Sequence, residues 1–558
     1  MDFINSLPIL LSQQDDNIPN VKQAVIGLAA SYALWRIVRK WLIKHPLDKI
    51  PGPKSSSYIS GYLFDLFNPD ALDAHDSLGR NYPGIARVPT LMGNVMLYVY
   101  DPKALHHIMV KDQHIFEESD DFLRFNKVVF GHGLLATLGE HHRKQRKMLN
   151  PVFSIAHMRE MIPIFYGISY KLRDAIRSEV SNGKTEIDML SWFTRTALEL
   201  IGQSGLGTSF DRLESDSQPH PYFESIKNLI RSLSIPRFII FPHVANIGTP
   251  RFRRFVVDLL PWKNLHALRD MVDVMANTSV EIFESKKRAF ELGDEAIHEQ
   301  VGQGKDIISI LLKANMLASE EDKLPDNELI AQISSLTFAA MDTTSNALSR
   351  ILHTLCEHPE AQDRLRQEIL QAREEHGELS YDELNNLTFL DAVCRETLRL
   401  YPPAPMVMRQ ARKDAILPLA RPITTLDGRQ ITEVVVPEGT QILVSILSCN
   451  KNPLVWGPDA DEWKPERWLS SLPASVTDAR IPGVYSHLMT FIGGNRACIG
   501  FKFSQLEMKI VLCTLLESFK FTGTDKKIKW KFNGITQPAV EGSGSSENEL
   551  PLNVSLIA

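Results

Sequence analysis

The chain has 558 residues, of which 44% are hydrophobic and 23% are charged, an ordinary globular composition. Its formal net charge of -6 disfavours a general nucleic-acid binder, which would carry a basic surface. Five cysteines, none of them in a Cys-x-x-Cys pair, disfavour a disulfide framework and a structural zinc site. A reducing compartment is the simpler reading, with one cysteine in a special role and four that pack.

An apolar segment near the N-terminus predicts membrane association. Residues Ala24–Trp35 are nearly all apolar, acidic residues precede them, and basic residues follow at Arg36, Arg39, Lys40 and Lys44. This excess of positive charge after the segment places the main domain in the cytosol. We therefore expect three parts: an N-terminal segment over residues 1–20, a single-pass membrane anchor over 21–43 and one large folded domain over 44–558.

Two alternatives to a full membrane span are open for this segment. The uninterrupted apolar run is short, because a span needs roughly 20 residues, so an amphipathic helix lying on the membrane is one alternative. A cleaved signal peptide fits less well, because only Lys22 provides a basic residue before the apolar core. Pro51-Gly52-Pro53 then predicts a stiff turn before the folded domain.

Most of the remaining sequence predicts helices. Apolar residues recur at helical spacing over Thr194–Gly205, Met271–Phe290 and Asn327–His358. Short strands are predicted over Val95–Tyr100 and Val434–Val436. We therefore expect a mainly α-helical domain with small β-sheets, in the α+β class. The region Ile235–Trp262 mixes apolar clusters with arginines and is interpreted as a mobile lid, a second membrane contact or a buried loop.

Two polar motifs lie within predicted helices. Asp342 and Thr343 stand in the middle of the longest one, where the threonine could merely bond back to a carbonyl one turn earlier. An acid next to an alcohol can also deliver protons to a bound ligand. Glu396 and Arg399 stand three residues apart, a spacing that by itself is typical of a surface pair worth roughly 0.2–0.5 kcal/mol.

The strongest signal is the segment from Phe491 to Gly500. Its glycines let the backbone turn tightly or approach a flat ligand, and Arg496 offers a fork of donors for a carboxylate. Apolar residues at helical spacing follow Cys498, so the cysteine is expected at a helix start, where unpaired N–H groups stabilise a thiolate. The simplest alternative is that Cys498 packs as a small hydrophobic residue.

This segment matches the pattern F-x-x-G-x-R-x-C-x-G at every fixed position and resembles the cytochrome P-450 family, microsomal type. The resemblance is closest to fungal members. It implies haem b (iron protoporphyrin IX), bound between a long central helix and the cysteine-loop helix, with Cys498 as the iron ligand. It also implies that Phe491 shields the sulfur and that Arg496 binds a haem propionate.

The resemblance assigns further residues by their motifs. Thr343 would hold the activated oxygen and Asp342 would relay protons, although the family's usual glycine is replaced by Ala340. Arg409, His142 and Arg146 would contact the propionates, with His142 in the place of the family's tryptophan. The resemblance also implies a buried network of Glu396, Arg399 and Arg467. Cys449-Asn450 stands where many members carry a histidine.

The implied activity is a monooxygenase that inserts one oxygen atom from O₂ into an apolar small molecule, such as a terpenoid, steroid or other lipid-like secondary metabolite. Electrons would come from NADPH through a separate reductase, since the sequence carries no flavin or nicotinamide motif. The expected location is the endoplasmic reticulum membrane, with no nucleic-acid partner. We expect the pocket to be lined by Phe122–Leu135, Ile333–Thr343, Ala404–Met408 and part of Ile235–Trp262, and a basic docking face from Arg143, Lys144, Lys147, Lys502 and Lys509.

Three other hypotheses remain at this point. A haem-thiolate isomerase or dehydratase would need no O₂, but such members often lack the threonine found here as Thr343. A haem-binding sensor or carrier would not need the acid–alcohol pair. A purely structural membrane protein would contain a packed cysteine and no haem.

Overall fold

The computed structural model describes residues 45–557, except residues 56, 58, 216, 218, 219, 230–246 and 544–546, together with the isolated residues 27, 31 and 35. The predicted N-terminal segment and all but those three residues of the predicted anchor lie outside this part of the chain. Among the helices so described, none combines the length and the apolar character that a membrane crossing requires.

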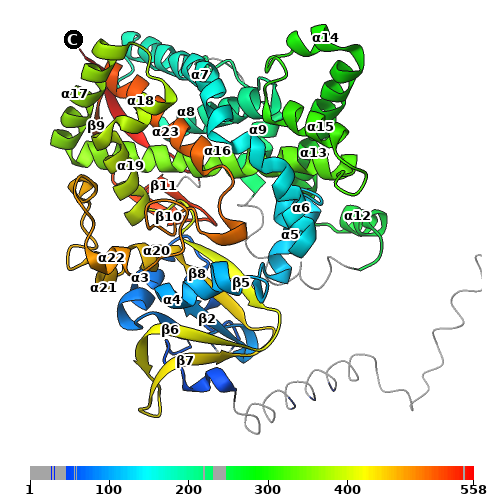
Figure 1. Ribbon diagram of the computed structural model, residues 1–558, viewed down its shortest axis with the longest axis vertical. Coiled ribbons are helices and arrows are strands. Elements are labelled where there is room, and N and C mark those ends of the chain that lie inside the picture. The colour runs from blue at the N-terminus through cyan, green and yellow to red at the C-terminus, as the bar shows by residue number, and fades with distance from the viewer. Residues whose placement is uncertain are drawn as a thin grey trace, which may run out of the picture.

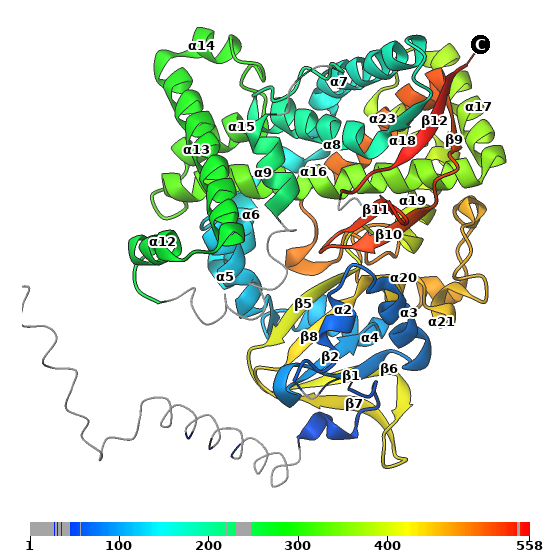
Figure 2. The same cartoon turned by 180° about the vertical axis from the view of Figure 1, so that it is seen from behind.

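Helices fill one part of the molecule, and the long helix α16 runs through the middle of them (Figures 1 and 2). The α-helices are α2 Leu63–Leu66, α3 Leu72–Asn81, α4 Pro102–His106, α5 Asp120–Val129, α6 Gly139–Leu149, α7 Ile155–Ser181, α8 Met189–Leu200, α9 Pro221–Leu229, α12 Pro250–Leu259, α13 Lys263–Leu292, α14 Asp294–His298, α15 Ile307–Leu317, α16 Asp326–Glu357, α17 Pro359–His376, α18 Tyr381–Asn386, α19 Thr388–Leu400, α20 Ile446–Asn450, α21 Pro453–Trp456, α22 Ala474–Thr477 and α23 Phe501–Ser518.

Short helices of other types join these elements. The 3-10 helices are η2 Pro46–Lys49, η3 Leu91–Gly93, η5 Leu134–Ala136, η6 Asn150–Phe153, η9 Pro465–Trp468 and η10 Gly494–Arg496, and the π-helices are η4 His107–Lys111 and η7 Ile201–Leu206. The predicted helix over Thr194–Gly205 is therefore the end of α8 continued by η7. The predictions over Met271–Phe290 and Asn327–His358 are confirmed by α13 and α16.

The strands form small separate sheets, most of them gathered beside the helical part (Figure 1). They are β1 Ile85–Pro89, β2 Val95–Val99, β3 Phe116–Glu117, β4 Glu186–Asp188, β5 Met406–Ala411, β6 Ala415–Thr424, β7 Gln430–Val436, β8 Gln441–Ser445, β9 Phe519–Gly523, β10 Ile528–Phe532, β11 Thr536–Val540 and β12 Pro551–Leu556. The largest sheet has the order β1-β2-β8-β5-β3, the others β4-β12-β9, β6-β7 and β10-β11. The expected α+β class is confirmed.

Two elements position the site. Helix α16 is buried along most of its length because its apolar residues recur on all sides, and it packs against α8, α13, α19 and α23. Helix α23 is buried almost as completely from Phe503 to Leu516. The segment before α23 carries the cysteine, and its short helix η10 packs against η4.

The described part of Ile235–Trp262 contains α12, and this helix buries none of its residues. The interpretation of this region as a buried loop is therefore wrong for residues 247–262. The remainder of the region lies outside the described residues.

Candidate active site

A cavity of about 220 Å³ lies between α16 and the segment that begins α23. Its walls come from four stretches of the chain that are far apart in the sequence. They are Glu118, Phe122, Leu134, Leu135, His142, Arg146 and Phe153 in the first, Ile201 in the second, Leu336, Ala339, Ala340, Thr343 and Thr344 in the third, and Phe491, Arg496–Gly500, Phe503 and Ser504 in the fourth. Cys498 and Thr343 therefore face one shared space.

The cysteine segment is a tight loop closed by its own backbone. The amide of Cys498 donates to the carbonyl of Phe491 at 2.9 Å. A side chain at Gly493 would place its Cβ 1.7 Å from the carbonyl oxygen of Pro482, and Gly494 has a φ of +73°. These two glycines are needed because neither the space nor the backbone conformation admits a larger residue.

Cys498 differs from the other four cysteines. It is exposed to the cavity, whereas Cys394, Cys449 and Cys513 are buried and Cys356 is partly buried. Burial raises the pKa of the Cys498 thiol, although the Gly500 N–H and the charge of Arg146 act in the opposite direction. The expected stabilisation by a helix start is therefore outweighed by desolvation. A metal cation is the partner that would deprotonate such a thiol, since a coordinating thiol loses its proton outright.

The acid–alcohol pair is divided between two faces of α16. The Thr343 hydroxyl borders the cavity and donates to the Ala339 carbonyl one turn earlier, at 2.7 Å. Asp342 is buried and is not part of the cavity wall. Burial raises the pKa of its carboxyl to about 7, with a smaller opposing effect from Lys227 on α9. Asp342 thus keeps its proton to a higher pH than an exposed aspartate does.

Basic side chains gather at one edge of the cavity. Arg496 donates to the Thr137 carbonyl at 2.6 Å, and Arg146 borders the cavity beside it. His142 also borders the cavity, and burial together with Arg496 and Arg146 lowers its pKa to about 3. His142 is therefore a neutral hydrogen-bonding group, while Arg146 and Arg496 bring positive charge.

Arg409 does not border the cavity. It lies behind Glu118, to whose carboxylate its Nη1 donates at 2.6 Å, and the other oxygen of Glu118 is 3.9 Å from Nε of Arg496. Glu118 is a wall residue that the sequence motifs did not indicate. It follows the short strand β3, whose pairing with the strand of Arg409 (β5) brings the two together.

The residues present fit the haem that the resemblance implies. The cavity joins a cysteine thiol on one wall with three arginines and a histidine near one edge, which suits an iron ligand and two carboxylates. Nη2 of Arg409 is buried with no hydrogen-bond partner in the part of the chain that the structure describes. A donor left in this state is what an anionic ligand would satisfy.

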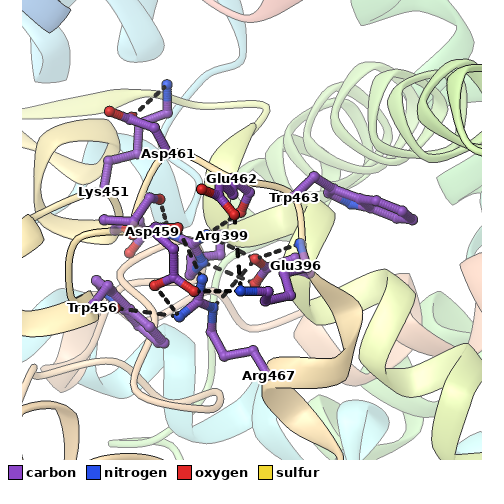
Figure 3. Close-up of polar contacts among 12 residues, drawn as sticks. Glu396, Arg399, Lys451, Trp456, Asp459, Asp461, Glu462, Trp463 and Arg467 are labelled. Carbon is purple, nitrogen blue, oxygen red and sulfur yellow. Dashed lines mark hydrogen bonds and ion pairs between the residues drawn. The ribbon is translucent and has the colours of Figure 1, made fainter.

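The network around Glu396 is confirmed (Figure 3). Arg399 directs two donors to the Glu396 carboxylate at 2.8 and 2.9 Å, and three to the carbonyls of Asn450, Ala460 and Glu462. Glu396 also accepts from Arg467 at 3.4 Å, and Glu396 and Arg399 are completely buried. All five N–H groups of Arg399 are used, so the network locks the helix α19 to the segments that follow α20.

The predicted pocket linings are confirmed in part. Phe122, Leu134 and Leu135 border the cavity, as do Leu336, Ala339, Ala340 and Thr343 of α16. The methyl group of Ala340 thus lies in the cavity wall. The stretch Ala404–Met408 does not border the cavity, and neither do residues 247–262.

The predicted basic face loses one member. Lys509 is buried, with its Nζ 2.9 Å from Asp391 and 2.8 Å from Asn385, so it is a core ion pair and that prediction is wrong. On α6, Arg143 pairs with Glu140 at 2.7 Å and Lys147 lies 3.6 Å from Asp322. Nearby acids therefore offset part of the remaining positive charge.

Comparison with known proteins identifies close relatives. The family model described as Cytochrome P450 matches residues 51–543. Cytochrome P450 monooxygenase 91 of Postia placenta is 51% identical over 94% of this chain and 97% of its own. Cytochrome P450 monooxygenase 212 of the same fungus is 49% identical over 95% and 98%. The ganoderic acid synthetase of Ganoderma lucidum is 42% identical over 97% and 100%.

Proposed function

This chain belongs to the cytochrome P450 family as a monooxygenase, and we propose that it inserts one oxygen atom from O₂ into an apolar, lipid-like small molecule. The observation that carries the proposal is the cavity that Cys498 and Thr343 share, with arginines at one edge. When bound there, haem b supplies the activation of dioxygen at its iron. Electrons would come from NADPH through a separate reductase.

The residues around the cavity have distinct proposed roles. Cys498 binds the iron as a thiolate, and Phe491, which borders the cavity beside it, covers the sulfur. Arg496, Arg146 and His142 hold the propionates from the cavity wall, and Arg409 supports them from behind Glu118. These side chains would hold the cofactor in the cavity that Thr343 also borders.

Proton delivery is assigned to the pair on α16. The Thr343 hydroxyl donates to the Ala339 carbonyl, which leaves its oxygen lone pairs free to accept a hydrogen bond from a water or another donor on the cavity side. Asp342 holds a proton near neutral pH because burial raises its pKa to about 7. A group with its pKa at the working pH can both release and recover a proton, as a relay must.

The substrate class follows from the cavity walls and one relative. Away from the arginine edge the walls consist mainly of Phe, Leu, Ile and Ala side chains. The name of the Ganoderma lucidum relative refers to ganoderic acid, and its similarity covers the whole of that protein. We therefore favour terpenoid or steroid substrates. Addition of such lipids should shift the haem absorption spectrum. If no lipid in the panel shifted the spectrum while polar amines did, this assignment would be contradicted.

Membrane association is part of the proposal, with the predicted anchor over residues 21–43 and a location at the endoplasmic reticulum. Helix α12 supports a contact with a lipid surface. Its apolar residues Phe252, Phe255 and Leu259 are 50%, 59% and 67% exposed, and they lie on one face because they are spaced by three and four residues. A helix that offers this face outward suits the boundary of a bilayer.

The test of the proposed function is the difference spectrum of the reduced protein with carbon monoxide. The wild-type protein should show the long-wavelength band of a thiolate-bound haem. Replacement of Cys498 by Ala should abolish this band, whereas Cys513→Ala, which changes a buried cysteine of α23 outside the cavity wall, should retain it. An unchanged spectrum in Cys498→Ala would refute the proposal.

A further inference from the structure

An acidic side chain, Glu118, lies in the part of the cavity wall where the proposed function places the two haem propionates. Glu118 is 8% exposed and borders the cavity together with Arg496, Arg146 and His142. Its position is fixed from two sides, because Oε2 accepts from Nη1 of Arg409 at 2.6 Å and Oε1 lies 3.9 Å from Nε of Arg496. A carboxylate in this place repels other carboxylates, so its presence requires an explanation.

The explanation lies in the balance of charge at this edge. Arg146, Arg409 and Arg496 carry three positive charges, and His142 is neutral at neutral pH because burial, Arg496 and Arg146 lower its pKa to about 3. Glu118 removes one of these charges and leaves two. Haem b carries two propionates, so the site with Glu118 matches the charge of these two carboxylates, whereas the arginines alone would exceed it.

Glu117 also acts on Arg496, but with a smaller effect than Glu118, and it does not border the cavity. Burial is the largest influence on Arg496, and its pKa is lowered from the ordinary value, with Glu118 as the main opposing effect. In surroundings that are poorly solvated, each uncompensated charge acts strongly on its neighbours, including a metal ion across the cavity. A change in the net charge of this edge should therefore shift the reduction potential of a haem iron bound in the cavity.

We propose that Glu118 is a charge-setting residue of the haem site, which holds Arg409 in place and keeps the reduction potential of the iron low. The proposal rests on the proposed function, because it needs haem bound with its propionates at this edge. Glu118 touches Arg409 directly and Arg496 at longer range, and it acts through them.

The experiment compares the reduction potentials of full-length holoproteins by spectroelectrochemical titration. Glu118→Gln keeps the shape and an acceptor oxygen for Arg409 but removes the negative charge. We expect haem to be retained and the potential to shift to a more positive value. Glu118→Asp keeps the charge and should retain the wild-type potential.

A matched control separates a local effect from a change in total charge. Asp121→Asn removes the same charge nearby in the chain, from a side chain that is 45% exposed and absent from the cavity wall, and should leave the potential unchanged. Equal potentials for wild type and Glu118→Gln would overturn the proposal, as would equal potentials for the Gln and Asp variants.

Loss of haem from Glu118→Gln would also overturn it, because a more positive site should hold a dianionic cofactor at least as well. If the wild-type protein itself bound no haem, the proposed function would be refuted. This outcome can be told apart from failure of the Glu118 proposal, because the haem content of the wild type is measured before any variant.

Discussion

At the residue scale, Asn450 joins two parts of the site that are far apart in the sequence. Its carbonyl accepts from Arg399 at 3.0 Å, and its side chain accepts from the amide of Met489 at 2.8 Å and donates to Thr490 at 2.9 Å. Asn450 is completely buried and therefore connects the Glu396 network to the start of the cysteine loop. Its side-chain amide thus serves as both donor and acceptor at this point.

Asp342 leads to a prediction about pH. Its pKa rises from 3.8 to about 7 in the folded protein, so the folded state keeps a proton that the unfolded state loses. The resulting stability is present below about pH 4 and is lost as the pH rises through 7, at about 1.4 kcal/mol per pH unit. The Asp342→Asn variant has no titrating group at this position, so it lacks this pH-dependent contribution to stability. Unfolding by denaturant between pH 5 and 8 should show the wild type losing stability relative to the variant up to about pH 7 and no further.

Contributions from histidines such as His142 and His75 cancel in this difference, since both proteins carry them. A constant difference over the whole pH range would contradict the raised pKa of Asp342. With Asp342→Asn fully loaded with haem, product formation should also fall by about 10² or more, as expected for the loss of a proton-transfer group.

The sequence predicted the cavity-wall residues that belong to a local motif, and it missed those whose placement depends on packing. Cys498, Arg496 and Phe491 lie in one short loop, and all three border the cavity. Glu118 carries no motif, and only the pairing of β3 with β5 places it at Arg409. Lys509 was predicted to lie on the surface, but it is paired with Asp391 on another helix. A contact between two helices cannot be read from the local sequence around Lys509.

At the scale of elements, the Glu396–Arg399 pair offers a direct comparison with a surface pair of the same spacing. Both side chains of the buried pair are completely inaccessible. Glu396→Gln would leave the charge of Arg399 buried without its counter-charge, so we expect the free energy of unfolding to fall by about 3–5 kcal/mol. Chemical denaturation and the haem content of purified protein would measure this.

The control is Glu140→Gln on α6. Glu140 and Arg143 also stand three residues apart with a 2.7 Å contact, but their side chains are 82% and 65% exposed. Water screens such a pair, so the control should change the unfolding free energy by far less. If both variants lowered the free energy of unfolding by a similar amount, the buried network would contribute no more to stability than the surface pair.

Helix α12 is attached to the protein by its charged face. Arg254 contacts Asp273 at 2.7 Å and Asp258 contacts Arg269 at 2.8 Å, and both partners lie on α13. The apolar face is therefore held outward, the reverse of an ordinary surface helix. If this face meets lipid, a tryptophan placed there should be accessible to quenchers within the bilayer.

We expect brominated lipids in vesicles to quench the added fluorescence of Phe255→Trp. Leu317→Trp is the matched control, because Leu317 at the end of α15 is also strongly exposed, at 79%. Equal quenching of both variants, or of neither, would count against a lipid contact at α12.

Elements with strong periodicity were predicted closely, and irregular ones were not. The predicted helix over Asn327–His358 differs from α16 by one residue at each end. The helix predicted from Thr194 changes to a π-helix at Ile201, because the change depends on packing against neighbouring elements and leaves no mark in the apolar spacing. The sheets rest on pairings between distant segments, so only single strands could be predicted.

At the scale of the whole molecule, the proposed haem site joins segments spread from residue 118 to residue 504. A ligand that binds only when these segments are assembled stabilises the entire fold, by about 4 kcal/mol at a free concentration of 1,000 times its dissociation constant. We expect added haem to raise the melting temperature of the haem-depleted wild-type protein. Cys498→Ala should show a much smaller increase, and an equal increase would indicate that haem binds elsewhere.

The largest sheet pairs a strand that is synthesised early with one that is synthesised late. Met96 to Val99 of β2 pair in parallel with Gln441 to Val444 of β8. A ribosome that adds about 5–20 residues per second leaves β2 waiting roughly 20 to 70 s for its neighbour. Throughout that interval the apolar strand has one edge without its partner, where it is open to other nascent chains. Overproduction of this protein should therefore depend on chaperones that shield the early strands, and slower synthesis alone should not relieve the demand.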